Sequence, residues 1–188
     1  MKKILIEELK KYPIIAAVKN EQELENALRT KCRMVFILFG DICSISGISE
    51  RIKSSGKIAV VHIDLITGLS SSDVAVQFIA ENTKIDGIIS TKSSLIKRAY
   101  ELGLITVQRV FMIDSIALKN VMQHIKHDYA DFIEILPGAL PKVIRSILSN
   151  VNINIISGGL VNDFEDVNAI LKAGAIAVST SNKRLWPS

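Results

Sequence analysis

Eight short apolar runs recur along this chain, and after the first seven the apolar side chains take on helical spacing. The runs lie at residues 13–18, 34–39, 58–63, 87–90, 104–111, 132–136, 154–157 and 177–179. Near-continuous apolar strands are typical of a parallel sheet that is buried on both faces. Strict alternation of strands and helices predicts an α/β fold, and eight repeats favour closure into a (β/α)8 TIM barrel. The alternative is a doubly wound open sheet.

The length of the chain limits this barrel to a compact form. At 188 residues, we expect one domain over residues 1–188, shorter than the ~250 residues typical of the fold. Residues 181–186 leave room only for a truncated last helix. Asn20 with Glu23 and Asn162 with Glu165 match the capping box, which predicts helices that begin after Asn20 and Asn162. Asp114 is predicted to cap the helix after the fifth strand.

The composition and the motif content limit the cellular compartment and the class of function that we expect. The net charge of +4 is compatible with an anionic ligand or a nucleic acid. Two cysteines, Cys32 and Cys43, make no disulfide framework, so we expect a reduced, cytoplasmic protein. No apolar run reaches the ~18 residues of a membrane span, and the N-terminus is no signal peptide. P-loop, dinucleotide-binding, HExxH and CxxC motifs are absent from the sequence, so we expect no cofactor and no metal.

The last two predicted strands end in residues suited to an anion. Ser157 is followed by Gly158 and Gly159, and two adjacent glycines allow bare backbone N–H groups to approach a ligand. A helix that starts just after them would add its own free N–H groups. The final strand ends in hydroxyls and an amide, at residues 179–182. Loops after strands seven and eight are the usual phosphate site of this fold, although each segment alone could be an ordinary turn or helix cap.

Other polar residues follow the remaining strands, and several interpretations of them stay open. They are Lys19, His62, Asp64, Ser90, Thr91, Lys92, Gln108, Arg109 and Glu134. Cations could neutralise a phosphate, and carboxylates could accept hydrogen bonds from hydroxyls. Alternatively, Arg109 and Glu134 pair inside the barrel, and His62 is a satisfied interior histidine. An acid/base pair of Asp64 and Glu134, or a Schiff-base Lys92, would instead indicate an enzyme.

Six blocks of the sequence resemble one protein family. They are residues 61–69, 86–92, 107–115, 133–138, 156–160 and 178–182, the last followed by Leu185 and Trp186. Together they resemble the bacterial glycerol uptake operon antiterminators, which are glycerol-3-phosphate-responsive regulators. The resemblance extends from Pro13 to Trp186.

The resemblance implies a barrel that binds glycerol 3-phosphate and acts on the leader of a glycerol-utilisation messenger RNA, as a binding protein without catalytic residues. The residues it places on the phosphate are Ser157, Gly158, Gly159, Ser179, Thr180, Ser181 and Asn182. Asp64, Arg109 and Glu134 would line the polar part of the pocket. Lys92 stands where the family would have arginine, and Thr67 where it would have a longer polar residue, so the ligand could be another phosphorylated polyol.

The partners are less constrained than the fold. Candidate RNA-contacting clusters are Arg51 with Lys53 and Lys57, and Lys92 with Lys97 and Arg98, but solvated charged faces explain either one. Aromatic residues make up 5% of the chain, so few side chains could stack on bases. The alternative function is a small phosphate-substrate barrel enzyme, such as an isomerase or aldolase, and a third is a barrel that has lost the RNA function. Homo-oligomerisation stays open, as does the loop that responds to ligand among residues 40–44, 64–70 and 90–93.

Overall fold

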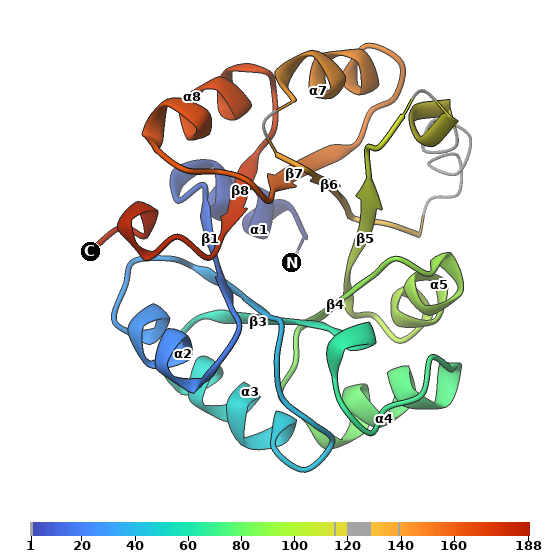
Figure 1. Ribbon diagram of the computed structural model, residues 1–188. Coiled ribbons are helices and arrows are strands. Elements are labelled where there is room, and N and C mark those ends of the chain that lie inside the picture. Colours follow the sequence, from blue (N-terminus) through green and yellow to red (C-terminus); the bar gives the residue numbers. More distant parts are fainter. Residues whose placement is uncertain (1, 115, 120–128, 139) are drawn as a thin grey trace.

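The structure is a computed structural model that describes residues 2–114, 116–119, 129–138 and 140–188. Its eight strands form one closed barrel in sequence order, with every neighbouring pair parallel and β1 joined to β8 (Figure 1). The strands are β1 (Ile14–Val18), β2 (Met34–Ile37), β3 (Ile58–His62), β4 (Gly87–Ser90), β5 (Ile105–Phe111), β6 (Phe132–Leu136), β7 (Asn154–Gly158) and β8 (Ala177–Thr180). The predicted (β/α)8 TIM barrel is confirmed, and the doubly wound alternative is wrong.

Helices surround the barrel as the alternating pattern predicts, while the leading helix α1 (Lys2–Lys11) lies inside their ring (Figure 1). The surrounding helices are α2 (Glu21–Leu28), α3 (Ile45–Ser54), α4 (Asp73–Asn82), α5 (Ser93–Glu101), α7 (Pro141–Leu148) and α8 (Phe164–Lys172), and short 3-10 helices η1 (Ile63–Leu65) and η2 (Lys183–Leu185) follow β3 and β8. Residues 116–119 are helical, and Asp114 caps them by accepting a hydrogen bond from the Ala117 N–H. The rest of that predicted helix, including Val121, Met122 and Ile125, lies outside the described residues, as do His124 and His127.

Side-chain caps mark the starts of α2 and α8, with one correction to the prediction. Asn20 caps α2 by accepting from the Glu23 N–H, as predicted, and the Glu23 carboxylate accepts from the Lys19 N–H. The cap of α8 is Asp163, one residue later than predicted, and its carboxylate accepts from the Asp166 N–H. Both positions carry good N-cap residues, so the sequence alone permitted either register.

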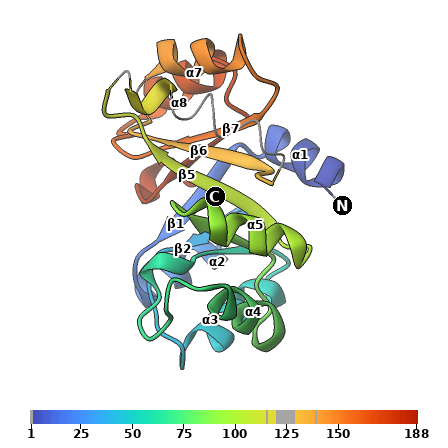
Figure 2. The ribbon, with the colours of Figure 1, turned by 90° about the vertical axis from the view of Figure 1, so that its right-hand side faces the viewer.

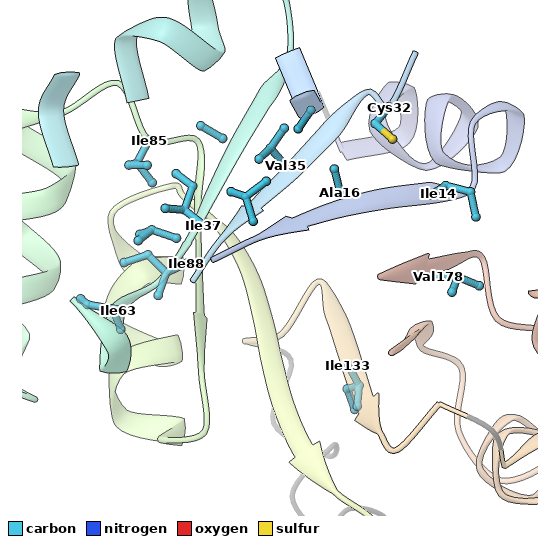
Figure 3. Packing of buried hydrophobic residues seen from close by; sticks show 14 of the residues in the cluster. Ile14, Ala16, Cys32, Val35, Ile37, Ile63, Ile85, Ile88, Ile133 and Val178 are labelled. Atoms are coloured by element: carbon cyan, nitrogen blue, oxygen red, sulfur yellow. The ribbon is translucent and has the colours of Figure 1, made fainter. Parts of the chain in front are cut away.

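Alternation along the strands divides the apolar side chains into two layers. One set points outward and packs between the strands and the helices, as Figure 3 shows for Val35, Ile37 and Ile88. The other set fills the barrel interior and includes Phe36 and Phe132, both almost completely buried. Residues next in sequence on each strand therefore serve different layers.

The two ends of the barrel are closed differently. Helix α1 lies beyond the N-terminal end (Figure 2), where Leu5 and Leu9 join the interior cluster. After β8, the predicted truncated helix is the single turn η2, and the Trp186 indole N–H donates to the Thr180 carbonyl at 2.9 Å. None of the described helices is both long enough and apolar enough to cross a membrane.

Candidate anion-binding site

A cavity of ≈ 480 Å³ opens at the C-terminal end of the barrel, beside the ends of β5 to β8. Its lining combines apolar and polar residues from the strands with residues of the last two βα loops. The lining residues are Ala17, Leu38, Arg109, Glu134, Leu136, Gly159, Leu160, Val161, Asn162, Ser179, Thr180, Ser181 and Asn182. The volume falls within the range of about 300–1,000 Å³ that is usual for small-molecule sites.

A row of hydrogen bonds joins three strands at the base of this cavity. Arg109 and Glu134 are register partners on β5 and β6, and Arg109 Nε donates to Glu134 Oε2 at 2.6 Å. Ser179, on β8, donates its hydroxyl to Glu134 Oε1, also at 2.6 Å. Both charged side chains are buried, so the predicted alternative of an interior pair is correct.

The pairing leaves most of the arginine available to a ligand. Only Nε of Arg109 is bonded to Glu134, and no described residue accepts from its two terminal nitrogens. Because Arg109 lines the cavity, these donors can meet an anion there in a planar, two-pronged arrangement. Glu134 therefore orients the guanidinium and offsets its charge while the cavity is empty.

Gly158 makes room for the bond between Ser179 and Glu134. A Cβ built on Gly158 would lie 2.0 Å from Ser179 Oγ and 3.3 Å from Glu134 Oε1. No real contact is that short, so a side chain here would displace the serine hydroxyl. The sequence predicts Gly158 as part of the phosphate cradle, and the structure places it beneath the polar row, outside the lining.

The loop between β7 and α8 presents backbone donors. Gly159 and Leu160 both have positive φ, 74° and 57°. Among the described residues, none accepts a hydrogen bond from the N–H groups of Gly159, Leu160 or Val161, or from that of Ser181 after β8. Consecutive N–H groups in such a turn form a concave anion site.

The N-terminus of α8 contributes less than the sequence predicts. Asp163 caps the helix, and the Asp166 carboxylate accepts from the Asn162 N–H at 2.8 Å. These carboxylates occupy donors that the prediction assigned to an anion. Within the cavity lining, the unbonded loop N–H groups are therefore those of residues 159–161 and Ser181.

Asn182 ties the two loops of the cradle together. Its side-chain N–H donates to the Asn162 carbonyl at 2.8 Å, and its side-chain oxygen accepts from the Arg184 N–H. Thr180 Oγ1 accepts from the Asn182 N–H. No described residue bonds to the Ser181 hydroxyl, which stays available to a ligand along with the loop N–H groups.

Besides Gly158, three predicted ligand residues lie outside the cavity lining. Ser157 points to the outer layer, where its hydroxyl donates to the Gly138 carbonyl. Asp64 accepts from the Ser90 hydroxyl at 2.8 Å and from the Thr91 N–H, so it joins the loops after β3 and β4. Lys92 is exposed on the second of these loops. Their contact with a ligand stays a prediction.

His62 is buried beside these groups and is neutral near pH 7. Burial is the main cause that lowers its pKa to about 4, and the nearby Arg109 guanidinium lowers it further. Asp64 acts in the opposite direction, with its Oδ2 3.6 Å from Nδ1 of His62. A neutral imidazole adds no positive charge to the site, which leaves Arg109 as the only cation that lines the cavity among the described residues.

Several lining residues escaped sequence reasoning. Part of the cavity wall is apolar and is formed by Ala17, Leu38 and Leu136. Alternation along their strands could have predicted that these side chains point inward. Leu160 and Val161 follow the glycine pair, and their role comes from the backbone conformation. A side-chain pattern carries no signal for that role.

A family model for glycerol-3-phosphate responsive antiterminators matches residues 14–186 of the chain. The chain belongs to this antiterminator family.

Relatives and solved structures agree with membership of the antiterminator family. A glycerol uptake operon antiterminator regulatory protein from Listeria monocytogenes str. 4b F2365 is 35% identical with a TM-score of 0.88, over 92% of this chain and 94% of that one. An antiterminator-related protein from Thermotoga maritima MSB8 is 33% identical with a TM-score of 0.83, over 92% and 96%. The uncharacterized protein YgcP of Escherichia coli (strain K12) is 41% identical over 97% of this chain and 95% of its own length.

The predicted RNA-contacting clusters of the chain are mostly engaged in other bonds. Arg51 pairs with Glu21 and Glu25. Lys53 pairs with Asp86 at 2.7 Å. Lys57 is buried and donates to two backbone carbonyls. In the second cluster, Lys97 and Arg98 both pair with Glu101. Lys92, the third member of that cluster, is exposed and forms no ion pair with a described residue. Contact of either cluster with RNA stays a prediction.

Proposed function

We propose that this chain is a glycerol-3-phosphate-responsive antiterminator that binds its ligand in the cavity at the C-terminal end of the barrel and acts on the leader of a glycerol-utilisation messenger RNA. The proposed ligand is supported by one guanidinium and a row of unbonded backbone N–H groups in the same cavity lining. The proposed action on messenger RNA is supported by family membership.

The chemistry of the lining suits a phosphorylated polyol. A phosphate would accept hydrogen bonds from residues 159–161, from Ser181 and from the terminal nitrogens of Arg109. A carboxylate has about four lone-pair sites, so Glu134 retains capacity for a ligand hydroxyl beside its bonds to Arg109 and Ser179. Ala17, Leu38 and Leu136 would pack against the carbon chain.

The same lining favours a binding protein over a phosphate-substrate enzyme. Among the described lining residues there is no lysine or histidine, and the single carboxylate is bonded to Arg109 and Ser179. A general base must reach the proton that it removes, and a Schiff base needs a desolvated lysine. Distant enzymes such as deoxyribose phosphate aldolase from Aeropyrum pernix, at 14% identity and a TM-score of 0.69, share the fold alone.

Calorimetric titration with glycerol 3-phosphate tests the ligand, with glycerol and inorganic phosphate as controls. We expect micromolar binding that is lost in Gly159→Asp, because a like charge then enters the cradle. Gly103→Asp is the matched control, since Gly103 has φ 76° against 74° for Gly159 and lies far from the cavity. Equal binding by the two variants would contradict the assignment of the cradle.

Retention of the leader transcript, measured with and without glycerol 3-phosphate, tests the regulatory part. We expect the ligand to change the affinity for RNA in the wild type and to have no effect in Gly159→Asp. Turnover of a phosphorylated substrate, lost when Glu134 is replaced by glutamine while binding is kept, would favour the enzyme instead.

A further inference from the structure

The N-terminal end of the barrel carries a set of exposed cations that the ligand site does not use. They are Lys11, Arg29, Lys31, Lys84 and Lys172, which we call the basal arc. These residues lie at the helix ends and turns that precede β1, β2, β4 and β8. Because β8, β1, β2, β3 and β4 are consecutive in the closed barrel, the arc follows one continuous side of the N-terminal rim.

The charge of the basal arc is not balanced by nearby acids. No described residue forms an ion pair with any of its five members, and Lys11 only lies over the Tyr12 ring. Two acids at this end pair with cations outside the arc, because Glu8 pairs with Arg33 at 2.9 Å and Asp86 pairs with Lys53. Glu81, in the last turn of α4, accepts only from the Gln77 side-chain amide and offsets at most one of the five charges of the arc. The surface between these pairs therefore keeps a positive excess.

Helix dipoles explain only part of this arrangement. Lys11 and Lys172 lie in the last turns of α1 and α8, where cations stabilise a helix. Lys31 and Lys84 lie beyond the ends of α2 and α4, outside the reach of that effect. No described residue forms an ion pair with either lysine, so no contact within the chain explains their positions.

We propose that the basal arc binds the phosphate backbone of RNA, at the end of the barrel opposite the ligand cavity. This proposal rests on the proposed function, and it names the surface on which that function depends. Separate cations spread over several turns suit an extended polyanion, whereas a small anion needs converging donors of the kind found at residues 159–161. Aromatic residues are only 5% of the chain, which also favours phosphate contacts over base stacking.

Location at the N-terminal end has a mechanistic consequence. Helix α1 carries Lys11 and lies at the N-terminal end of the barrel (Figure 2). Its Leu5 and Leu9 join the interior cluster, so this member of the arc is attached to the core. RNA bound there would leave the cavity open to the small ligand. The two partners could then bind together, as a ligand-responsive regulator requires.

Paired charge reversals test the surface. Lys31→Glu with Lys172→Glu alters the arc, and Lys119→Glu with Lys142→Glu is the matched control with the same change in net charge. Lys119 and Lys142 are exposed at helix starts, at the C-terminal end of the barrel, and form no ion pair with a described residue. The probe is an in vitro transcript of the leader that precedes the host's glycerol-utilisation genes. Filter binding gives its affinity at several salt concentrations, and calorimetry with glycerol 3-phosphate verifies that the cavity is intact.

We expect the arc variant to bind the transcript at least tenfold more weakly, and the control variant to stay within about twofold of wild type. The neutral variant Lys31→Ala with Lys172→Ala should reduce the slope of log affinity against log salt by about 1.4, since each single-strand phosphate contact contributes about 0.7.

Three results would overturn the proposal. A control variant that loses as much affinity as the arc variant would show that net charge, not this surface, matters. Wild-type binding that neither pair weakens would place the RNA on another surface while the regulatory function stands. A wild type that retains no transcript but floats with phosphatidylserine vesicles would remove the RNA function and with it this surface.

Discussion

The two ends of this barrel are built from the same strands and differ in what they leave unbonded. At the N-terminal end, α1 covers the interior and buries Leu5 and Leu9 among apolar side chains. At the C-terminal end, charged and hydroxyl groups replace the apolar layer, and the loop at residues 159–161 keeps free N–H groups. Burial of apolar surface stabilises the first end, while the second accepts unbonded donors that a ligand can satisfy. The comparison therefore predicts that stability and ligand affinity can be changed separately.

Leu9→Ala should give the largest effect on stability and leave ligand affinity unchanged. Leu9 is fully buried, and truncation of such a leucine costs about 2–5 kcal/mol of unfolding free energy. Chemical denaturation measures the loss, and Ile4→Ala on the exposed side of the same helix is the control, with an expected change under about 0.5 kcal/mol. A tenfold loss of glycerol 3-phosphate affinity in Leu9→Ala would show that packing under α1 also shapes the cavity, and would contradict the separation of stability from affinity.

Acid should reduce stability through His62, at the boundary of the two regions. The folded pKa of about 4 lies below the ordinary value, so the unfolded chain takes up this proton first as the pH falls. The contribution of the neutral imidazole is complete above pH ~6.5, is lost progressively towards pH 4, and amounts to about 3 kcal/mol. Denaturation of wild type and His62→Gln at a series of pH values isolates it. Parallel curves for the two proteins would refute the prediction.

Arg109→Lys should weaken ligand binding by about 2 kcal/mol, or roughly 30-fold, with a smaller effect on stability. One ammonium group cannot both bond to Glu134 and present a planar pair of donors to the cavity. Calorimetry measures the loss, and Arg51→Lys on the outer surface is the control that should bind normally. Unchanged affinity in Arg109→Lys would mean that the guanidinium has only a structural role.

Lys92→Ala should give the smallest effect, a change in affinity under about twofold. The side chain is exposed and lies outside the cavity lining, so the surrounding water screens its charge. The same titration measures it. A loss of tenfold or more would mean that Lys92 reaches the bound ligand, as its place among the predicted ligand residues implies.

The fold was readable from the sequence because hydrophobic alternation and helix caps act locally. Strand neighbours followed from the barrel, so the pairing of Arg109 with Glu134 could be anticipated before their register was known. Ser157 shows where side-chain chemistry alone misleads. Alternation places it on the outer side, between the inward positions of Ile156 and Gly158.

The sequence could not predict which backbone N–H groups of the site stay unbonded. Which N–H groups stay unbonded depends on the dihedral angles at Gly159 and Leu160 and on the capping of α8 by Asp163. The shift of that cap from Asn162 also depends on a distant contact, because the Asn162 carbonyl accepts from the Asn182 side chain. Contacts between loops far apart in sequence leave no local pattern.

The position of Trp186 makes its fluorescence a probe of ligand binding. It is the only tryptophan in the sequence, it is buried, and its indole is bonded to the backbone of Thr180 in the cavity wall. Tryptophan emission, excited selectively over that of the three tyrosines, therefore originates from one fluorophore bonded to the strand that a ligand would touch. Occupancy can be followed in real time on the unlabelled protein, and the kinetics of entry and release become accessible by stopped flow.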